Sequence, residues 1–415
     1  MLRIRRVRIL GGLAVAALVA AVGVSAATSA TNQASKVVIW ADADRTPAVT
    51  QVANAWAQDK GVTVQVVQKD FGNIRSQMTT VAAETAPDII VGAHDWIGEL
   101  STNGSVVPLT IAAATRKDFP AYALNAFSYG VAVKRLYGIP VALENIALIT
   151  NTKLAKVPKS WADLEKQALA VKKKKKTQVG LAVQQGAGGD AYHMYPMFSG
   201  LGGYIFGANK AGNLDASDIG VANKKFLKNT KLIDQWNKEG LIRSQVAWDT
   251  ARDLFTKGKV AYYITGPWFV SDIKKAGIKY KISAFPSIVP GFKPTPFLGV
   301  QGFMVTKFAA THGVESLAKD LVASYMARPA SQLALAAANG RFPASVAAGK
   351  QVKDPDLKAF GAASQGGVPM PNIPAMNSVW QDLGAAWVRS TKGAGSIPAR
   401  RSFIGAKKSI AQKIG

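Results

Sequence analysis

The chain has 415 residues, a formal net charge of +26 at pH 7, no cysteine and three histidines. This length suits about two domains, and the lack of cysteine excludes disulfides, thiol catalysis and cysteine–zinc sites. His94, His193 and His312 lie far apart in the sequence without the spacing of metal ligands. We therefore expect neither a bound metal nor a cofactor.

Residues 1–30 are predicted to be a secretory signal. Four arginines within the first eight residues precede a run of apolar and small residues, and the small residues from Val24 to Ala30 suit a signal peptidase. An uncleaved membrane anchor is the alternative, because the run is slightly long for a signal and short for a spanning helix. Either way the rest of the chain is expected outside the cytoplasm, in the periplasm or on the exterior of the cell envelope.

The remaining chain is strongly basic. Without the four arginines of the signal, 47 basic residues stand against 25 acidic ones, a formal charge of +22. Such a charge attracts anionic lipid, wall polymers or nucleic acid. Nucleic acid is not an expected partner, since the basic residues are mostly scattered and no nucleic-acid motif occurs. The run VKKKKKTQ (171–178) is interpreted as the exposed end of a helix, with contact to an anionic partner as the alternative.

The first predicted elements form a parallel sheet with helices packed on it. KVVIWA (36–41), VTVQVVQ (62–68) and DIIVGA (88–93) are strand-like. A helix capped by Thr46 and ended by Gly61 separates the first two strands, and a helical stretch around 74–84 follows the second. Ligands bind beyond the carboxyl ends of such strands, so the loops 42–45 and 94–96 are candidates for a site.

The middle of the chain predicts a crossing into a second α/β lobe. YGIPVALENIALITN (137–151) is strand-like but carries Glu144, a charge that is costly unless it faces water or a ligand. An ion-paired carboxylate at a domain crossing is the alternative. Between 147 and 297 strand-like runs alternate with helical ones, of which one begins with Ser160 as a cap.

The segment MPNIPAMNSVW (370–380) predicts a rigid, extended lead-in to a helix, because Pro371 and Pro374 fix φ and lack backbone donors. Trp380 then lies near the start of that helix, either packed in the core or facing a ligand. Strand-like GVQGFMVTK (299–307) precedes this segment, and a closing helix is expected from about 396 to 414.

Several segments occur in the order and spacing of the maltose/maltodextrin-binding proteins, and from about Lys36 to Gly415 the chain resembles that family. The segments are KVVIWADADRT, APDIIVGAHDWIG, YGIPVALENIALITN, GGYIF, TGPWFV, FLGVQGF and MPNIPAMNSVW. The resemblance implies an extracytoplasmic solute-binding component of an ABC importer. It also implies the α/β two-lobe periplasmic-binding-protein fold (type II), with three hinge crossings around a cleft. The N-terminal lobe would comprise residues 36–143 and 299–348, and the C-terminal lobe residues 147–297 and 353–415.

Sugar-binding roles are also implied by the resemblance. They fall on Asp44, Arg45, Asp95, Glu144, Asp190, Tyr192, Trp268 and Trp380. Gly92 stands where the family has a tryptophan, and Gln381 and Gly384 stand where it has Tyr and Arg. The chain thus lacks one aromatic wall and one guanidinium, and Trp96 is the candidate to replace the wall. Maltose, longer maltodextrins and trehalose all remain open as ligands.

These residue types suit a sugar, because aromatic rings cover its apolar faces and carboxylates accept from its hydroxyls. We expect a non-enzymatic monomer that closes on an oligosaccharide and presents it to ABC permease subunits. A glycoside hydrolase that uses two of the four carboxylates is one alternative. A wall-binding or adhesion protein, held to an anionic envelope by its basic surface, is another. His94 is expected to form structural hydrogen bonds, and core or surface packing is expected for Trp40, Trp56, Trp161, Trp236 and Trp387.

Overall fold

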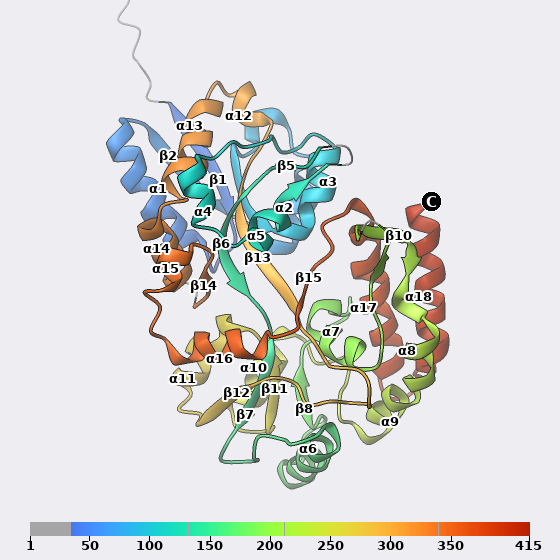
Figure 1. Cartoon of the computed structure of the whole chain (residues 1–415). Coiled ribbons are helices and arrows are strands. Elements are labelled where there is room, and N and C mark those ends of the chain that lie inside the picture. Colours follow the sequence, from blue (N-terminus) through green and yellow to red (C-terminus); the bar gives the residue numbers. More distant parts are fainter. Residues whose placement is uncertain (1–34, 131–132, 211, 339) are drawn as a thin grey trace, which may run out of the picture. The chain divides into compact units, whose positions relative to one another are not determined.

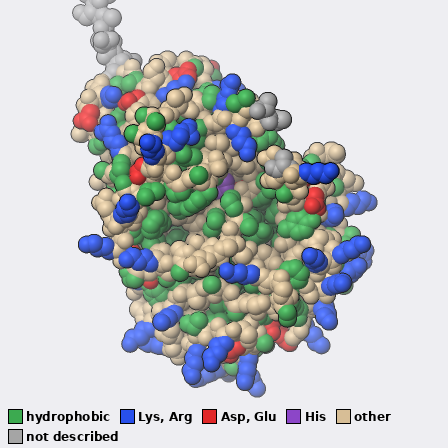
Figure 2. Space-filling view, in the orientation of Figure 1, with side chains coloured by type: hydrophobic (Ala, Val, Ile, Leu, Met, Phe, Trp, Pro, Cys, Tyr) green, Lys and Arg blue, Asp and Glu red, His purple; other side chains and the backbone are tan. Residues whose placement is uncertain are grey.

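The computed structural model describes residues 35–130, 133–210, 212–338 and 340–415 (Figure 1). The predicted signal, residues 1–30, lies outside the described part of the chain. Within that part, no helix is both long enough and apolar enough to cross a membrane. Lysine and arginine side chains stand at many separate places on the face shown in Figure 2, as the scattered basic residues of the sequence predict.

Seven strands form the first sheet in the order β14-β6-β13-β3-β1-β2, with β15 beside β13. Their bounds are β1 Lys36–Ala41, β2 Thr63–Gln68, β3 Ile89–Ala93, β6 Ile139–Glu144, β13 Phe297–Val305, β14 Phe342–Pro343 and β15 Val368–Pro369. β1 pairs in parallel with β2 and β3, which confirms the predicted parallel sheet. β13 runs antiparallel to both β3 and β6, and Figure 1 shows it beside β6.

Four strands form the second sheet in the order β12-β7-β11-β8. Their bounds are β7 Ala147–Asn151, β8 Leu181–Val183, β11 Tyr262–Thr265 and β12 Tyr280–Ser283. The chain passes from the first sheet to the second between β6 and β7, directly after Glu144, and returns between β12 and β13. The two sheets confirm the predicted α/β two-lobe fold. The lobe boundaries and the number of crossings stay predictions.

Helices and short hairpins complete the described part. The hairpins pair β4 (Ser128–Tyr129) with β5 (Arg135–Leu136), and β9 (Phe206–Ala208) with β10 (Leu214–Ile219). The α-helices up to residue 239 are α1 Thr46–Lys60, α2 Phe71–Gln77, α3 Ile97–Thr102, α4 Ala113–Lys117, α5 Ala121–Ala126, α6 Trp161–Lys175, α7 Ala191–Gly200, α8 Lys224–Asn229 and α9 Lys231–Glu239. Those that follow are α10 Trp248–Thr256, α11 Val270–Lys275, α12 Phe308–Thr311, α13 Glu315–Lys319, α14 Pro329–Ala338, α15 Val346–Gly349, α16 Pro355–Ala363, α17 Asn377–Thr391 and α18 Ala399–Ile414. Short 3-10 or π turns are η1 Ala83–Thr85, η2 His94–Trp96, η3 Gly220–Ala222, η4 Pro267–Phe269, η5 Asp320–Tyr325 and η6 Pro374–Met376.

Two helices near the first sheet differ from the predictions. Thr46 is the first residue of α1 and not its cap, and its hydroxyl donates to the Asp42 carbonyl at 2.8 Å. The expected helix over 74–84 ends at Gln77, and a separate turn follows at Ala83. The β-branched run Thr79–Val81 explains the break, because such side chains lose χ1 freedom in a helix.

Other helix signals are confirmed. Gly61 ends α1 with φ of 66°, a left-handed conformation that glycine adopts without strain. The Ser160 hydroxyl accepts from the backbone N–H of Asp163 at 3.1 Å and so caps α6. The lysine run ends α6, where positive charge also complements the helix dipole. Trp380 lies in the first turn of α17, directly after the proline-rich segment.

Candidate functional site

All nine predicted site residues line one cavity of about 450 Å³. Five of them follow or end strands of the first sheet: Asp44, Arg45, Asp95, Trp96 and Glu144. Three belong to segments around the second sheet: Asp190, Tyr192 and Trp268. Trp380 lies in the first turn of α17. Trp268 and Trp380 are both partly buried and open onto this same cavity. The fold therefore brings together residues that are up to several hundred positions apart in the sequence.

Two of the indoles pack closely against a glycine. A Cβ atom added to Gly92 would lie 2.1 Å from the Trp96 ring, and one added to Gly266 would lie 2.2 Å from the Trp268 ring. Only glycine leaves room for the rings at these positions. Trp96 also contacts Phe71, with ring centroids 5.0 Å apart. Gly92 stands where the resemblance implies a tryptophan. Because Gly92 has no side chain, it leaves room for the Trp96 ring, which lines the cavity.

Replacing Gly92 with alanine is expected to displace Trp96 and lower the free energy of unfolding by about 1–3 kcal/mol, the usual cost of overpacking. Urea denaturation measures this change. Gly405→Ala is the matched control, since its added Cβ would meet open space within α18 and is expected to be neutral or slightly stabilising. Equal stability of Gly92→Ala and the parent protein would contradict the seating of Trp96 on Gly92.

Trp380 is fixed by a polar and an aromatic contact. Its Nε1 donates to Oδ2 of Asp95 at 3.0 Å, and its ring meets Phe297 edge to face with centroids 5.7 Å apart. Asp95 is almost fully buried, and burial raises the pKa of its carboxyl while His94 and Arg75 oppose the rise. The bond from Trp380 therefore both orients the indole and gives a buried carboxylate a donor.

The loop after β1 places Asp44 and Arg45 in different surroundings. Arg45 is buried and pairs with Asp42, three residues earlier, through its Nη1. Asp44 is mostly exposed, with 64% of its side chain accessible, and it also lines the cavity. Burial lowers the pKa of the Arg45 guanidinium, and the nearby Arg341 lowers it further. Arg45 thus enters the cavity with its charge already compensated.

Glu144 is the ion-paired carboxylate that we weighed as the alternative, and it also lines the cavity. Its Oε2 is 2.5 Å from Nε of Arg341, and its Oε1 accepts from Nε2 of Gln301 at 2.7 Å. Both charged side chains are only 7% exposed. Burial alone would raise the pKa of Glu144, but Arg341 and Arg45 lower it, so the carboxylate stays charged.

Asp190 caps α7 and holds two neighbouring side chains. Its Oδ1 accepts from the backbone N–H of His193 at 2.9 Å. Its Oδ2 accepts from Nδ1 of His193 at 2.9 Å and from Nε2 of Gln184 at 2.7 Å. Burial would raise the pKa of Asp190, but His193 and these hydrogen bonds lower it. The prediction placed Asp190 at the site but gave no role to His193 or Gln184.

The cavity wall contains buried polar atoms that have no hydrogen-bond partner within the described residues. They are Gln184 Oε1, Tyr192 Oη, His193 Nε2 and Gln301 Oε1. The two glutamines use their donors on carboxylates, so their unpartnered oxygens are acceptors, and His193 Nε2 is an acceptor in the neutral imidazole whose Nδ1 donates to Asp190. Burying such a group without a partner costs about 1–3 kcal/mol, which a ligand that donates hydrogen bonds would offset. This wall therefore favours a ligand rich in hydroxyl groups over an anion.

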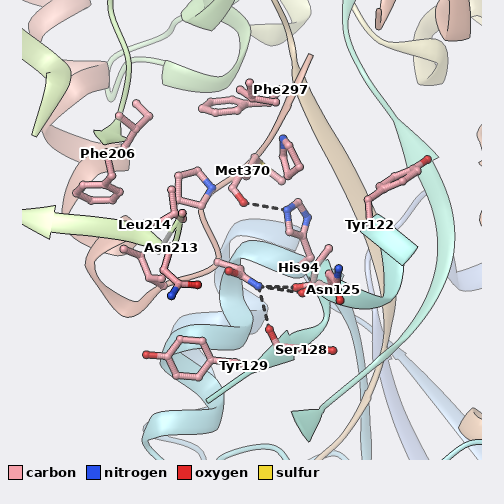
Figure 3. Close-up of a pocket in the computed structure, with 18 of the residues that line it drawn as sticks. His94, Tyr122, Asn125, Ser128, Tyr129, Phe206, Asn213, Leu214, Phe297 and Met370 are labelled. Carbon is pink, nitrogen blue, oxygen red and sulfur yellow. Dashed lines mark hydrogen bonds between the residues drawn. The ribbon is translucent and has the colours of Figure 1, made fainter. Parts of the chain in front are cut away.

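A larger hollow of about 900 Å³ shares Met370 with the first cavity, and Figure 3 shows residues that line this larger hollow. Its lining contains Lys134 but, among the described residues, no carboxylate. His94 has both ring nitrogens occupied there: Nδ1 accepts from the Val300 N–H at 3.1 Å and Nε2 donates to the Met370 carbonyl at 3.0 Å. The smaller cavity is the better candidate because it holds the carboxylates and the unpartnered acceptors.

Sequence reasoning missed several residues of the smaller cavity. Arg341 precedes β14 and lies over the Trp268 ring, with 5.5 Å between its Cζ and the ring centroid. Arg341 thus supplies a guanidinium to the cavity, whereas Gly384 stands where the resemblance implies an arginine. Trp248, which is 50% exposed, also lines the cavity. No local sequence pattern marks Trp248 or Arg341 as part of the cavity, and only the structure places them there.

The other tryptophans that were predicted to pack in the core or on the surface lie outside the cavity wall. Trp40, Trp56, Trp161, Trp236 and Trp387 are all buried. Trp161 and Trp236 contact each other at 5.2 Å between ring centroids. Within the described ranges, no cluster of three or more histidine, cysteine, aspartate or glutamate side chains could hold a metal ion.

Comparison with known proteins agrees with a binding function. Residues 51–359 match the family model described as bacterial extracellular solute-binding protein. A galactooligosaccharide-binding protein of Bacillus subtilis is 29% identical over 378 residues, which cover 87% of this chain and 86% of the relative. A maltodextrin-binding protein of the same organism is 29% identical over 380 residues, covering 87% of each chain. A maltooligosaccharide ABC transporter solute-binding lipoprotein of Streptococcus pneumoniae is 25% identical over 371 residues, or 85% of this chain and 83% of the relative.

Proposed function

Because the chain belongs to the bacterial extracellular solute-binding protein family, we propose that it binds a neutral oligosaccharide and delivers it to the permease subunits of an ABC importer. The observation that carries the proposal is the set of unpartnered acceptors in the wall of the cavity. The hydroxyl groups of a sugar are donors that would satisfy them.

The charges of the cavity support a neutral ligand. Arg45 is paired with Asp42, and Arg341 is paired with Glu144. A carboxylate or phosphate on the ligand would have to compete with these buried pairs for a cation, and it would face Asp95 and Asp190 as well. A hydroxyl group carries no such electrostatic cost.

The aromatic rings support a ligand with apolar faces. Trp96, Trp268 and Trp380 line the cavity, and each indole can cover the C–H face of a pyranose. The relatives that are 29% identical are named for galactooligosaccharides and maltodextrin. We therefore propose a gluco- or galacto-oligosaccharide, with maltodextrins as the first candidates.

The carboxylates support binding over hydrolysis. A glycosidase needs one carboxyl group whose raised pKa keeps it protonated as a general acid. The pKa of Glu144 and that of Asp190 are both lowered, and each carboxylate accepts hydrogen bonds from neighbouring side chains. Asp95 has a raised pKa, but its Oδ2 accepts from Trp380. We propose that the protein acts outside the cytoplasm as a non-enzymatic carrier.

A thermal-shift screen of the purified protein tests this function. The panel contains maltose, maltotriose, maltotetraose, trehalose and galactotriose, with galacturonic acid oligomers as anionic controls. We expect a neutral oligosaccharide to raise the melting temperature, because a ligand at 100 times its Kd adds about 2.7 kcal/mol of stability. A preference for the anionic sugars, or no response to any sugar in the panel together with no heat in calorimetry, would overturn the proposal.

A further inference from the structure

Resting on the proposed function, we infer that His193 is a specificity-determining residue whose Nε2 accepts a hydrogen bond from one hydroxyl group of the ligand. The inference begins with the proton on its ring. Nδ1 lies 2.9 Å from Oδ2 of Asp190, and a carboxylate of this kind only accepts. Nδ1 therefore carries the proton, and in the neutral imidazole Nε2 presents its lone pair.

The His193 ring is fixed in the wall of the cavity, and its Nε2 is left without a partner among the described residues. The side chain of His193 is only 6% exposed, Nε2 has no partner among the described residues, and the residue lines the cavity. The ring stands edge to face against Trp268, with centroids 6.0 Å apart at 81°, and against Tyr192, at 5.4 Å and 71°. These contacts and the bond to Asp190 fix the ring, so Nε2 cannot turn to another partner without breaking them.

Gln184 repeats the arrangement beside it. Its Nε2 donates to the same oxygen of Asp190, and its Oε1 is left as a buried acceptor. Asp190 therefore acts as a positioning residue that holds two acceptor-bearing side chains in the wall of the cavity. A sugar must offer a hydroxyl to this wall, and a ligand that lacks it leaves buried acceptors unpaired.

The consequence is selection by one hydroxyl group of the sugar. Removing the donor from the ligand or the acceptor from the protein is expected to weaken binding about 10- to 100-fold, the usual effect of losing one partner of a buried hydrogen bond. When the ligand lacks the hydroxyl group and the protein lacks the acceptor, the loss of affinity is expected to be little more than for either single change. In that case no buried hydrogen-bonding group is left without its partner.

Titration calorimetry of the full chain tests the inference with maltotriose, galactotriose and the monodeoxy derivatives of the tighter binder. His193→Phe keeps a ring but has no acceptor, so it is expected to bind about 10- to 100-fold more weakly. His193→Gln places an amide oxygen near the position of Nε2 and is expected to recover part of the affinity. The parent protein is expected to bind one monodeoxy derivative more weakly than it binds the intact sugar. His193→Phe is expected to bind that derivative and the intact sugar equally.

His312→Phe is the matched control. His312 also bonds to an aspartate, with Nδ1 at 2.7 Å from Oδ1 of Asp88, but it is not in the cavity wall. Its loss is expected to lower stability and to leave affinity within about twofold of the parent.

The outcomes separate the two proposals. If the parent protein and His193→Phe bind the sugar equally well, the inference is overturned and the proposed function stands. If the His193 variants do not fold, the monodeoxy series on the parent protein decides alone: equal binding of every derivative overturns the inference. Parent protein that binds no sugar overturns the proposed function, and the inference with it.

Discussion

Replacing Trp380 with alanine is expected to weaken oligosaccharide binding by about 100-fold. An indole buries about 150–250 Å² when covered, worth up to about 4–6 kcal/mol at about 25 cal/mol per Å². A ligand covers only part of that area, so we expect a loss of about 2.7 kcal/mol, or 100-fold. The change also removes the donor to buried Asp95. Titration calorimetry with the best ligand of the screen measures the loss.

Two further variants separate the contributions of Trp380. Trp380→Phe keeps an aromatic ring but not the Nε1 donor to Asp95, and is expected to lose about 10-fold. Trp387 lies in the same helix, and its side chain is fully buried away from the cavity. The Trp387→Phe variant is therefore expected to bind the ligand with the affinity of the parent protein. Affinity of Trp380→Ala within about threefold of the parent would show that the indole is not part of the binding surface.

Replacing Glu144 with glutamine is expected to lower the free energy of unfolding by about 3–5 kcal/mol, because it leaves the charge of Arg341 buried without its main partner. Glutamine has nearly the same shape, so packing changes little. The effect arises from the 2.5 Å contact between Glu144 and Arg341, because both side chains are almost completely buried. Urea denaturation at neutral pH measures the difference.

A double-mutant cycle is the control for this pair. Removing both charges, in Glu144→Gln with Arg341→Met, is expected to cost clearly less than the sum of the two single changes. The surface pair Lys257–Asp253 gives the comparison, since breaking an exposed pair costs at most about 1 kcal/mol. Additive effects at Glu144 and Arg341 would contradict the buried ion pair.

The sequence predicted the first sheet and the helical position of Trp380 because their signals are local, whereas the sugar-binding roles of Trp268 and Trp380 came from the resemblance to a family. Alternation of strand-like runs with a helix ended by Gly61 is enough to imply parallel pairing of β1, β2 and β3. The carboxyl ends of β1 and β3 then place Asp44 and Asp95 at one edge. The two prolines before Trp380 predicted its place in the first turn of α17.

The polar network of the cavity could not be predicted in the same way, because its pairs join distant segments. Arg341 meets Glu144 across 197 positions, and Gln301 meets it across 157. The Asp42–Arg45 pair is local, but either Asp42 or Asp44 could reach Arg45 from the sequence alone, and the turn before α1 selects Asp42. The acceptor role of His193 depends on which of its nitrogens Asp190 occupies, which only coordinates show.

A crystal structure of the protein with the tightest-binding neutral oligosaccharide of the screen tests the central claim most directly. We predict the sugar in the cavity between Trp268 and Trp380, with hydroxyl groups within hydrogen-bonding distance of His193 Nε2, Gln184 Oε1 and Gln301 Oε1. A sugar bound instead in the larger hollow beside Tyr122, or at the exposed lysines of α6, would contradict it.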